Sequence, residues 1–195
     1  MLGSKRYSES RTVLCFTAQR DLVTTGRSSC RVNQSINRRI LAHAEDFDAI
    51  FEMVKVATEG SLGMHRAGLT LVLGDIPNNV GAYHQMGSNA IVMNRNLLRI
   101  VQKLSNSKAR VNSYVFMILL HEYLHTLGFE SDRQVRDLSR QISKGFFGGR
   151  HLASDMAIMP LDRFFPDLPK FATFRDKGEY ETVRRFDSSS TPYIG

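Results

Sequence analysis

The feature that most constrains the fold is an apolar run that ends in three polar side chains. Residues 111–127 read VNSYVFMILLHEYLHTL. A run of this length predicts a helix, with Asn112 or Ser113 near its start and Gly128 just beyond its end. The helix would be apolar nearly all round. We therefore expect it to run through the middle of the fold, with other elements covering it on several sides.

The polar side chains of this helix have the spacing of a metal site. His121 and His125 are four residues apart, so both imidazoles lie on one face of a helix and can bind one metal ion. Glu122 is rotated away from that face and can reach a metal-bound water without binding the metal. Zinc lowers the pKa of such a water to about 7, and Glu122 can then act as general base and acid. The alternative is a hydrogen-bonded histidine pair in a core helix, which needs several buried partners.

With this motif the sequence resembles the zincin metallopeptidases, and in particular small intracellular HExxH proteins of prokaryotes, archaea especially. The resemblance rests on HEYLHTLG and covers residues 45–160. It implies an α+β fold in which a small twisted mixed sheet has an edge strand over the central HExxH helix, with further helices packed on the sheet. NAIVMN, residues 89–94, is the natural candidate for that edge strand. Strand addition would then hold a peptide substrate against Asn89, Ala90, Ile91 and Val92.

A catalytic zinc site needs a third protein ligand, and the zincin branches predict different ones. The metzincin pattern continues HExxHxxGxxH or HExxHxxGxxD, but Ser131 stands where that third ligand belongs. The gluzincin pattern takes the ligand from the following helix, where Asp132 has a comparable place. An acid in a first helical turn is also favoured by the helix dipole alone. Glu130, in the turn, ranks below Asp132.

His151 is the alternative third ligand. It follows the breaker FFGGR, so the chain could return to the metal there, or the imidazole could stabilise an oxyanion. It could equally be a surface histidine. SDMAIMP resembles a metzincin Met-turn, with Met156 or Met159 as its methionine, although ordinary core packing explains such a methionine as well. The three remaining histidines are interpreted as incidental: His43, His65 and His84.

The other predicted elements surround the motif helix. Apolar spacing predicts helices over residues 45–60, 95–104 and 131–143, the last with the capping-box pair Ser131 and Gln134. Residues 67–75 and 89–94 are predicted strands, and the residues between them are predicted to form a loop.

Charge divides the chain into three parts: a basic arm over residues 1–40, a zincin-like catalytic domain over 41–172, and a polar tail over 173–195. The arm has a net charge of +6 of the +7 total. Its cations are Lys5, Arg6, Arg11, Arg20, Arg27, Arg31, Arg38 and Arg39, against Glu9 and Asp21. Such an arm could contact nucleic acid or a ribonucleoprotein such as the ribosome, or be a solvated leader. The rival function is therefore a binding protein on a zincin scaffold.

The cysteine count and the apolar segments bear on disulfide bonds, membrane insertion and cellular location. Two cysteines do not indicate a disulfide scaffold, and no stretch reaches the ~18 consecutive apolar residues of a transmembrane helix. With no apolar segment typical of a secretory signal, we expect a cytoplasmic protein without a membrane partner. The sequence thus predicts a cytoplasmic zinc peptidase acting on a peptide or protein substrate.

Overall fold

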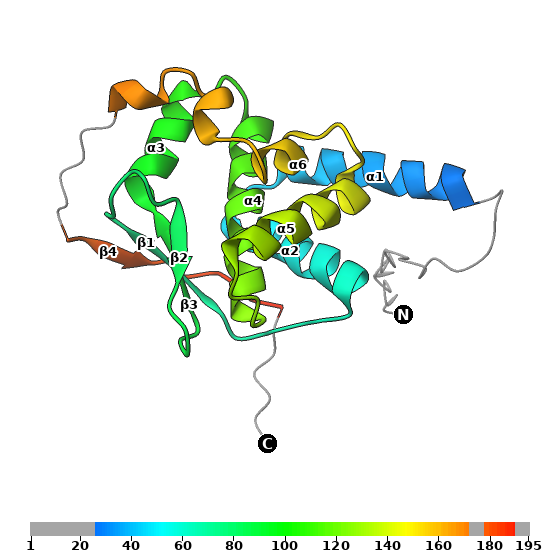
Figure 1. Ribbon diagram of the computed structural model, residues 1–195, viewed down its shortest axis with the longest axis horizontal. Coiled ribbons are helices and arrows are strands. Elements are labelled where there is room, and N and C mark those ends of the chain that lie inside the picture. The colour runs from blue at the N-terminus through cyan, green and yellow to red at the C-terminus, as the bar shows by residue number, and fades with distance from the viewer. Residues whose placement is uncertain (1–25, 172–177, 190–195) are drawn as a thin grey trace, which may run out of the picture.

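The computed structural model describes residues 26–171 and 178–189 and shows a mixed α+β fold (Figure 1). Its helices are α1 (Gly26–His43), α2 (Phe47–Leu62), α3 (Arg95–Leu104), α4 (Lys108–Thr126), α5 (Asp132–Phe147) and α6 (Leu152–Met156). Short 3-10 turns follow at Leu161–Arg163 and Leu168–Phe171. The strands are β1 (Thr70–Gly74), β2 (Ala82–His84), β3 (Ala90–Asn94) and β4 (Tyr180–Thr182). All the predicted helices are present.

The sheet has the strand order β2-β3-β1-β4. β1 and β3 are parallel, whereas β2 pairs with β3 and β4 pairs with β1 in the antiparallel sense. The prediction that residues 89–94 form the edge strand is therefore wrong, because β3 lies between β1 and β2 and both its edges are paired. The edge strands are β2 and β4, and β2, which contacts α4, lies within the segment predicted as a loop. Asn89, Ala90, Ile91 and Val92 consequently lack the free backbone that strand addition requires.

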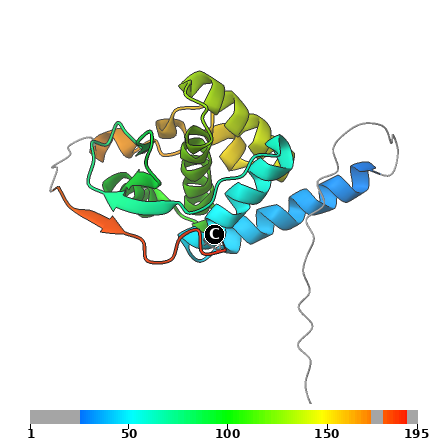
Figure 2. The ribbon, with the colours of Figure 1, turned by 90° about the horizontal axis from the view of Figure 1, so that it is seen from below.

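Helix α4 lies between the sheet and helices α1, α2, α5 and α6, as its apolar sequence predicts. It contacts α1, α2, α5 and α6 on one side and β2 and β3 on the other (Figures 1 and 2). Its fully buried aromatic residues Tyr114, Phe116 and Tyr123 pack into the main core with Phe51 of α2 and Phe147 of α5. None of the described helices combines the length and the apolar character needed to span a bilayer.

Local capping sets the ends of α2. The Asp46 side chain accepts a hydrogen bond from the backbone N–H of Ala49 at 2.8 Å, which satisfies one of the unpaired donors of the first turn. The helix ends at Gly63, whose φ of 65° is the left-handed conformation that glycine adopts most readily. The helix therefore begins and ends two residues later than the predicted range of 45–60.

The predicted arm boundary at residue 40 falls inside α1. Asn37 is buried and its side-chain amide donates to the Phe146 carbonyl at 3.0 Å, while Arg38 donates to the carbonyl of Phe147. Leu41 is buried in the core. The end of α1 is thus part of the domain, because these side chains satisfy the last carbonyls of α5. Residues 1–25 of the predicted arm lie outside the described residues.

Residues 178–189, assigned to a polar tail from the sequence, belong to the fold. β4 extends the sheet beside β1, and Phe186 stacks on Phe51 with ring centroids 4.3 Å apart. Asp187 is buried, where it accepts hydrogen bonds from the Lys55 ammonium and from the backbone N–H of Leu69 at 2.9 Å. The polar sequence concealed this role because the segment is held by backbone pairing and one buried ion pair.

Candidate metal centre

The last turns of α4 present the histidine pair as the spacing predicts. The Nε2 atoms of His121 and His125 lie 3.3 Å apart, and each side chain is 20% exposed. Burial, together with the neighbouring His125, lowers the pKa of His121. A lowered pKa keeps the imidazole neutral at neutral pH, which is the form that binds a metal ion.

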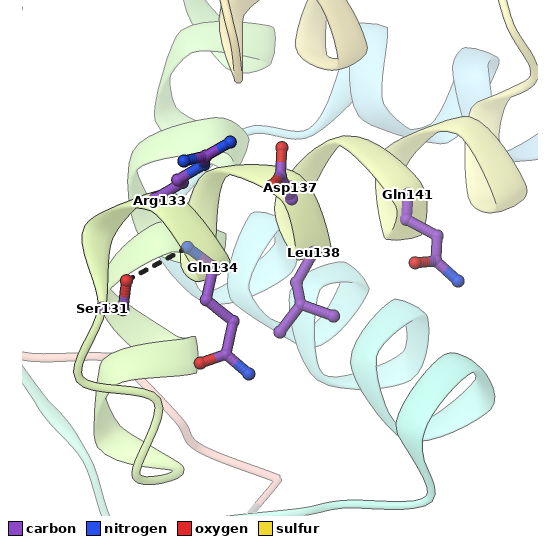
Figure 3. Close-up of a pocket in the computed structure, with 6 residues that line it drawn as sticks. All are labelled: Ser131, Arg133, Gln134, Asp137, Leu138 and Gln141. Carbon is purple, nitrogen blue, oxygen red and sulfur yellow. Dashed lines mark hydrogen bonds between the residues drawn. The ribbon is translucent and has the colours of Figure 1, made fainter.

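Asp132 is brought to this pair by a tight turn between α4 and α5. Gly128 has a φ of 97°, which reverses the chain after the helix. The Ser131 hydroxyl then accepts from the backbone N–H of Gln134 and starts α5, as Figure 3 shows. This cap places Asp132 as the first residue of α5. Its Oδ1 lies 3.3 Å from His125 Nε2 and 3.6 Å from His121 Nε2.

These three ligand atoms have the spacing that a tetrahedral metal ion requires. Zinc binds imidazole nitrogen and carboxylate oxygen at about 2.0–2.2 Å, so two ligands of one tetrahedral ion lie roughly 3.3–3.6 Å apart. The three distances above are 3.3, 3.3 and 3.6 Å. His121, His125 and Asp132 could therefore hold a metal ion without rearrangement of the backbone. The Asp132 side chain is 74% exposed, so the cluster is accessible to solvent on the Asp132 side.

A backbone carbonyl fixes the orientation of one ligand. His125 Nδ1 lies 2.7 Å from the carbonyl oxygen of Phe129, in the turn after α4. A carbonyl only accepts, so Nδ1 carries the proton and Nε2 presents its lone pair to His121 and Asp132. This arrangement is typical of metal-binding histidines, whose second nitrogen donates to a carbonyl or carboxylate.

Glu122 is buried beside the cluster. Burial first, and then the negative charge of Asp132, raise the pKa of Glu122 to about 7. A hydrogen bond from the backbone N–H of His84 acts in the opposite direction. A carboxyl group with a pKa near neutrality can both take and return a proton at physiological pH. His84, interpreted as incidental from the sequence, thus contributes through its backbone, for which no sequence signal exists.

Arg66 connects the end of α4 to the loop before β3. Its guanidinium donates to the Thr126 carbonyl at 2.6 Å, to the Ser88 carbonyl at 3.0 Å and to Asn89 Oδ1 at 2.8 Å. Its backbone N–H also donates to the Tyr123 hydroxyl at 2.8 Å. A cation at a helix C-terminus is favourable electrostatically. These contacts fix the loop before β3 relative to the last turn of α4, which carries His125, and no sequence pattern predicted them.

The alternative third ligand His151 lies elsewhere. Its ring stacks on Phe147 at 4.4 Å between centroids, and its Nδ1 accepts from the backbone N–H of Ala153 at 3.3 Å. Burial, and secondarily the charge of Arg38, lower its pKa to about 4. His151 is therefore a neutral cap of α6 and lies outside the metal cluster. Met156 is a core residue in the same region, in accord with ordinary packing.

Comparisons with protein-family models, with curated proteins and with solved structures gave no match from which a family could be assigned. The chemical capacity of the site is therefore inferred from its own geometry. Two imidazoles, a carboxylate and a buried glutamate of raised pKa define a candidate metal centre with an adjacent proton-transfer group.

Proposed function

We propose that this protein is a zinc-dependent peptidase of zincin-like architecture. The observation that carries the proposal is the spacing of His121, His125 and Asp132, whose ligand atoms already match a tetrahedral ion. Two imidazole nitrogens and one carboxylate, the ligand group found among the described residues, are typical of catalytic rather than structural zinc sites. Zinc bound there supplies a Lewis acid and lowers the pKa of a coordinated water to about 7.

Glu122 supplies proton transfer in this proposal. Its carboxylate takes a proton from the attacking water as the water oxygen bonds to the scissile carbonyl carbon. The same carboxyl group then returns the proton to the leaving nitrogen as the C–N bond breaks. The raised pKa of Glu122, to about 7, suits both steps at neutral pH. The His84 backbone N–H holds the carboxylate in place between them.

The edge strand β2 replaces β3 as the proposed substrate surface. The backbone N–H of Asn94 donates to the Gly81 carbonyl at 2.9 Å, so Gly81 and Asn94 form a hydrogen-bonded pair between β2 and β3. Hydrogen-bonded and non-hydrogen-bonded residue pairs alternate along two antiparallel strands. The backbone groups of Ala82 and His84 therefore point away from β3. An extended peptide that pairs with β2 would use the N–H and carbonyl of Ala82 and the carbonyl of His84.

Zinc content and peptide cleavage test the proposal together. Wild type is expected to bind one zinc ion, and His121→Ala with His125→Ala to bind none. Glu122→Gln is expected to keep the zinc but lose at least about 100-fold in cleavage of a peptide library, because proton transfer contributes 10²–10⁴-fold. Glu130→Gln is the matched control, because this acid is exposed in the turn after α4 and is not part of the His121, His125 and Asp132 cluster.

Two results would contradict the proposal. One is a wild-type protein that remains metal-free after incubation with zinc. The other is cleavage that Glu122→Gln leaves unchanged. Attachment to RNA or a ribonucleoprotein through residues 1–40 stays a prediction, since residues 1–25 lie outside the described structure.

A further inference from the structure

A row of cations runs along one side of α5. Arg133, Arg136, Arg140 and Lys144 follow one another at intervals of three, four and four residues, and all are exposed. Residues three and four apart are neighbours on the same side of a helix. At about 1.5 Å of rise per residue, the row is roughly 16 Å long. We refer to these four residues as the α5 basic row.

The α5 basic row starts at the candidate metal centre. Arg133 follows the ligand Asp132 directly in sequence. One turn further, Arg136 lies close enough to His121 for its charge to act on the imidazole. The row then leads away from the metal ligands. A substrate polypeptide whose scissile bond lies at the cluster can therefore continue along the row.

These cations are not neutralised within the described part of the molecule. No carboxylate of residues 26–171 or 178–189 forms a salt bridge with the α5 basic row, whereas Lys55 and Arg95 are ion-paired. Figure 3 shows Arg133 and Asp137 above α5 in that view, and Gln134 and Leu138 below it. Together with Asp137, the α5 basic row has a formal charge of +3 instead of +4. Like charges one turn apart destabilise a helix, and within α5 only Asp132 and Asp137 offset the repulsion among the four cations.

We propose that the α5 basic row is a docking surface for an acidic segment of the polypeptide substrate. This inference rests on the proposed peptidase function and gives it a substrate class: extended chains with several carboxylates on one side of the cleaved bond. The length of the row matches about five residues of extended chain at 3.3 Å each. Charge complementarity of this kind steers the partner and fixes its register.

The row fits an acidic peptide better than a nucleic acid. Single-stranded nucleic acids are bound through basic grooves together with exposed aromatic side chains on which the bases stack. The exposed residues of α5 are arginine, lysine, glutamine, aspartate and glycine, and its aromatic residues Phe146 and Phe147 are buried. A single narrow row therefore favours one extended acidic chain.

Binding to the full-length Glu122→Gln protein tests this without cleavage. The probes are a fluorescein-labelled peptide of alternating glutamate and alanine, its glutamine-for-glutamate counterpart, and a short single-stranded oligothymidylate, each followed by fluorescence anisotropy. The acidic peptide is expected to bind more tightly than its neutral counterpart at low salt, and more weakly as salt rises. Adding Arg136→Gln with Arg140→Gln should weaken its binding roughly three- to thirty-fold.

A matched control removes the same charge elsewhere. Arg99→Gln with Lys108→Gln changes two exposed cations, on α3 and at the far end of α4 from His125. This pair should change the dissociation constant less than about two-fold. Equal loss in both double variants, or equal binding of the two peptides by the parent protein, would overturn the docking proposal. So would tighter binding of the oligothymidylate that depends on the row.

Failure of this inference and failure of the proposed function are distinguishable. Selective binding of the acidic peptide by a protein that cleaves no peptide would leave the docking surface and remove the enzyme. Cleavage of peptide pools without preference for acidic sequences would leave the enzyme and remove the docking surface. Mass spectrometry of products from acidic and neutral pools gives the second readout.

Discussion

Replacing Asn94 by alanine should destabilise this fold more than the loss of any ordinary helix cap. Asn94 is completely buried at the junction of β3 and α3. Its Oδ1 accepts from the backbone N–H of Leu97 at 2.9 Å, which caps α3. Its side-chain nitrogen donates to the carbonyls of Ile76, Pro77 and Val80 at 2.9–3.0 Å. One side chain therefore holds both the start of a helix and the loop that leads into β2.

The magnitude follows from these contacts. Loss of a helix cap costs about 1 kcal/mol, and each buried hydrogen bond contributes about 1 kcal/mol. The two N–H groups of Asn94 are shared among three carbonyls, so they count as two bonds. The expected loss is about 3 kcal/mol in the free energy of unfolding, equivalent to roughly 6–12 °C in melting temperature for a chain of this size. Asp46→Ala removes only the cap of α2 and should cost about 1 kcal/mol.

Urea unfolding of wild type, Asn94→Ala and Asp46→Ala, followed by circular dichroism, measures both values. The difference between the variants isolates the contacts to the loop over residues 76–80. If Asn94→Ala cost no more than Asp46→Ala, the loop carbonyls would not depend on Asn94 and the reasoning would be refuted. Because the loop positions His84 beside Glu122, Asn94→Ala should also lower peptide cleavage at temperatures where it remains folded.

Three further perturbations have expected outcomes. Asp132→Asn should weaken zinc binding at least about 100-fold in competition with a chelating dye, because it removes a charged ligand, whereas Asp137→Asn should not. The protein should lose stability on acidification because of His151. The pKa of His151 in the folded state, about 4, lies below the ordinary 6.5, so the unfolded chain binds more protons between these values. The contribution of His151 to the free energy of unfolding should be fully present above pH 6.5 and fall by about 1–2 kcal/mol toward pH 4, after allowance for partial exposure. His151→Asn keeps the helix cap and should abolish this pH-dependent contribution. A stability series against pH that is identical in the two proteins would contradict it. Gly145→Ala, in open space within α5, should stabilise by about 0.5–1 kcal/mol, whereas Gly128→Ala, at a φ of 97°, should destabilise by about 1 kcal/mol or more.

The sequence alone determined the features that depend on near neighbours in the chain. The spacing of His121 and His125 fixes their common face because an α-helix has 3.6 residues per turn. The Ser131 cap and the turn at Gly128 were likewise predicted, because each is decided by one residue and its local backbone. The mixed α+β class was implied by the resemblance that the motif carries, and the locally predicted helices and strands agree with it.

The tertiary structure decided which distant segments meet. Hydrophobicity shows that β3 is buried but not which strands flank it, so the edge strand was misplaced. The pairing of β4 and the buried Asp187 gave no local signal, because their partners are more than a hundred residues away. Asp132 and His151 were alternatives in the sequence, and only the path of the chain after α4 brings Asp132 to the histidines. The contact of His84 with Glu122 uses a backbone group that every residue except proline has, so only three-dimensional placement distinguishes it.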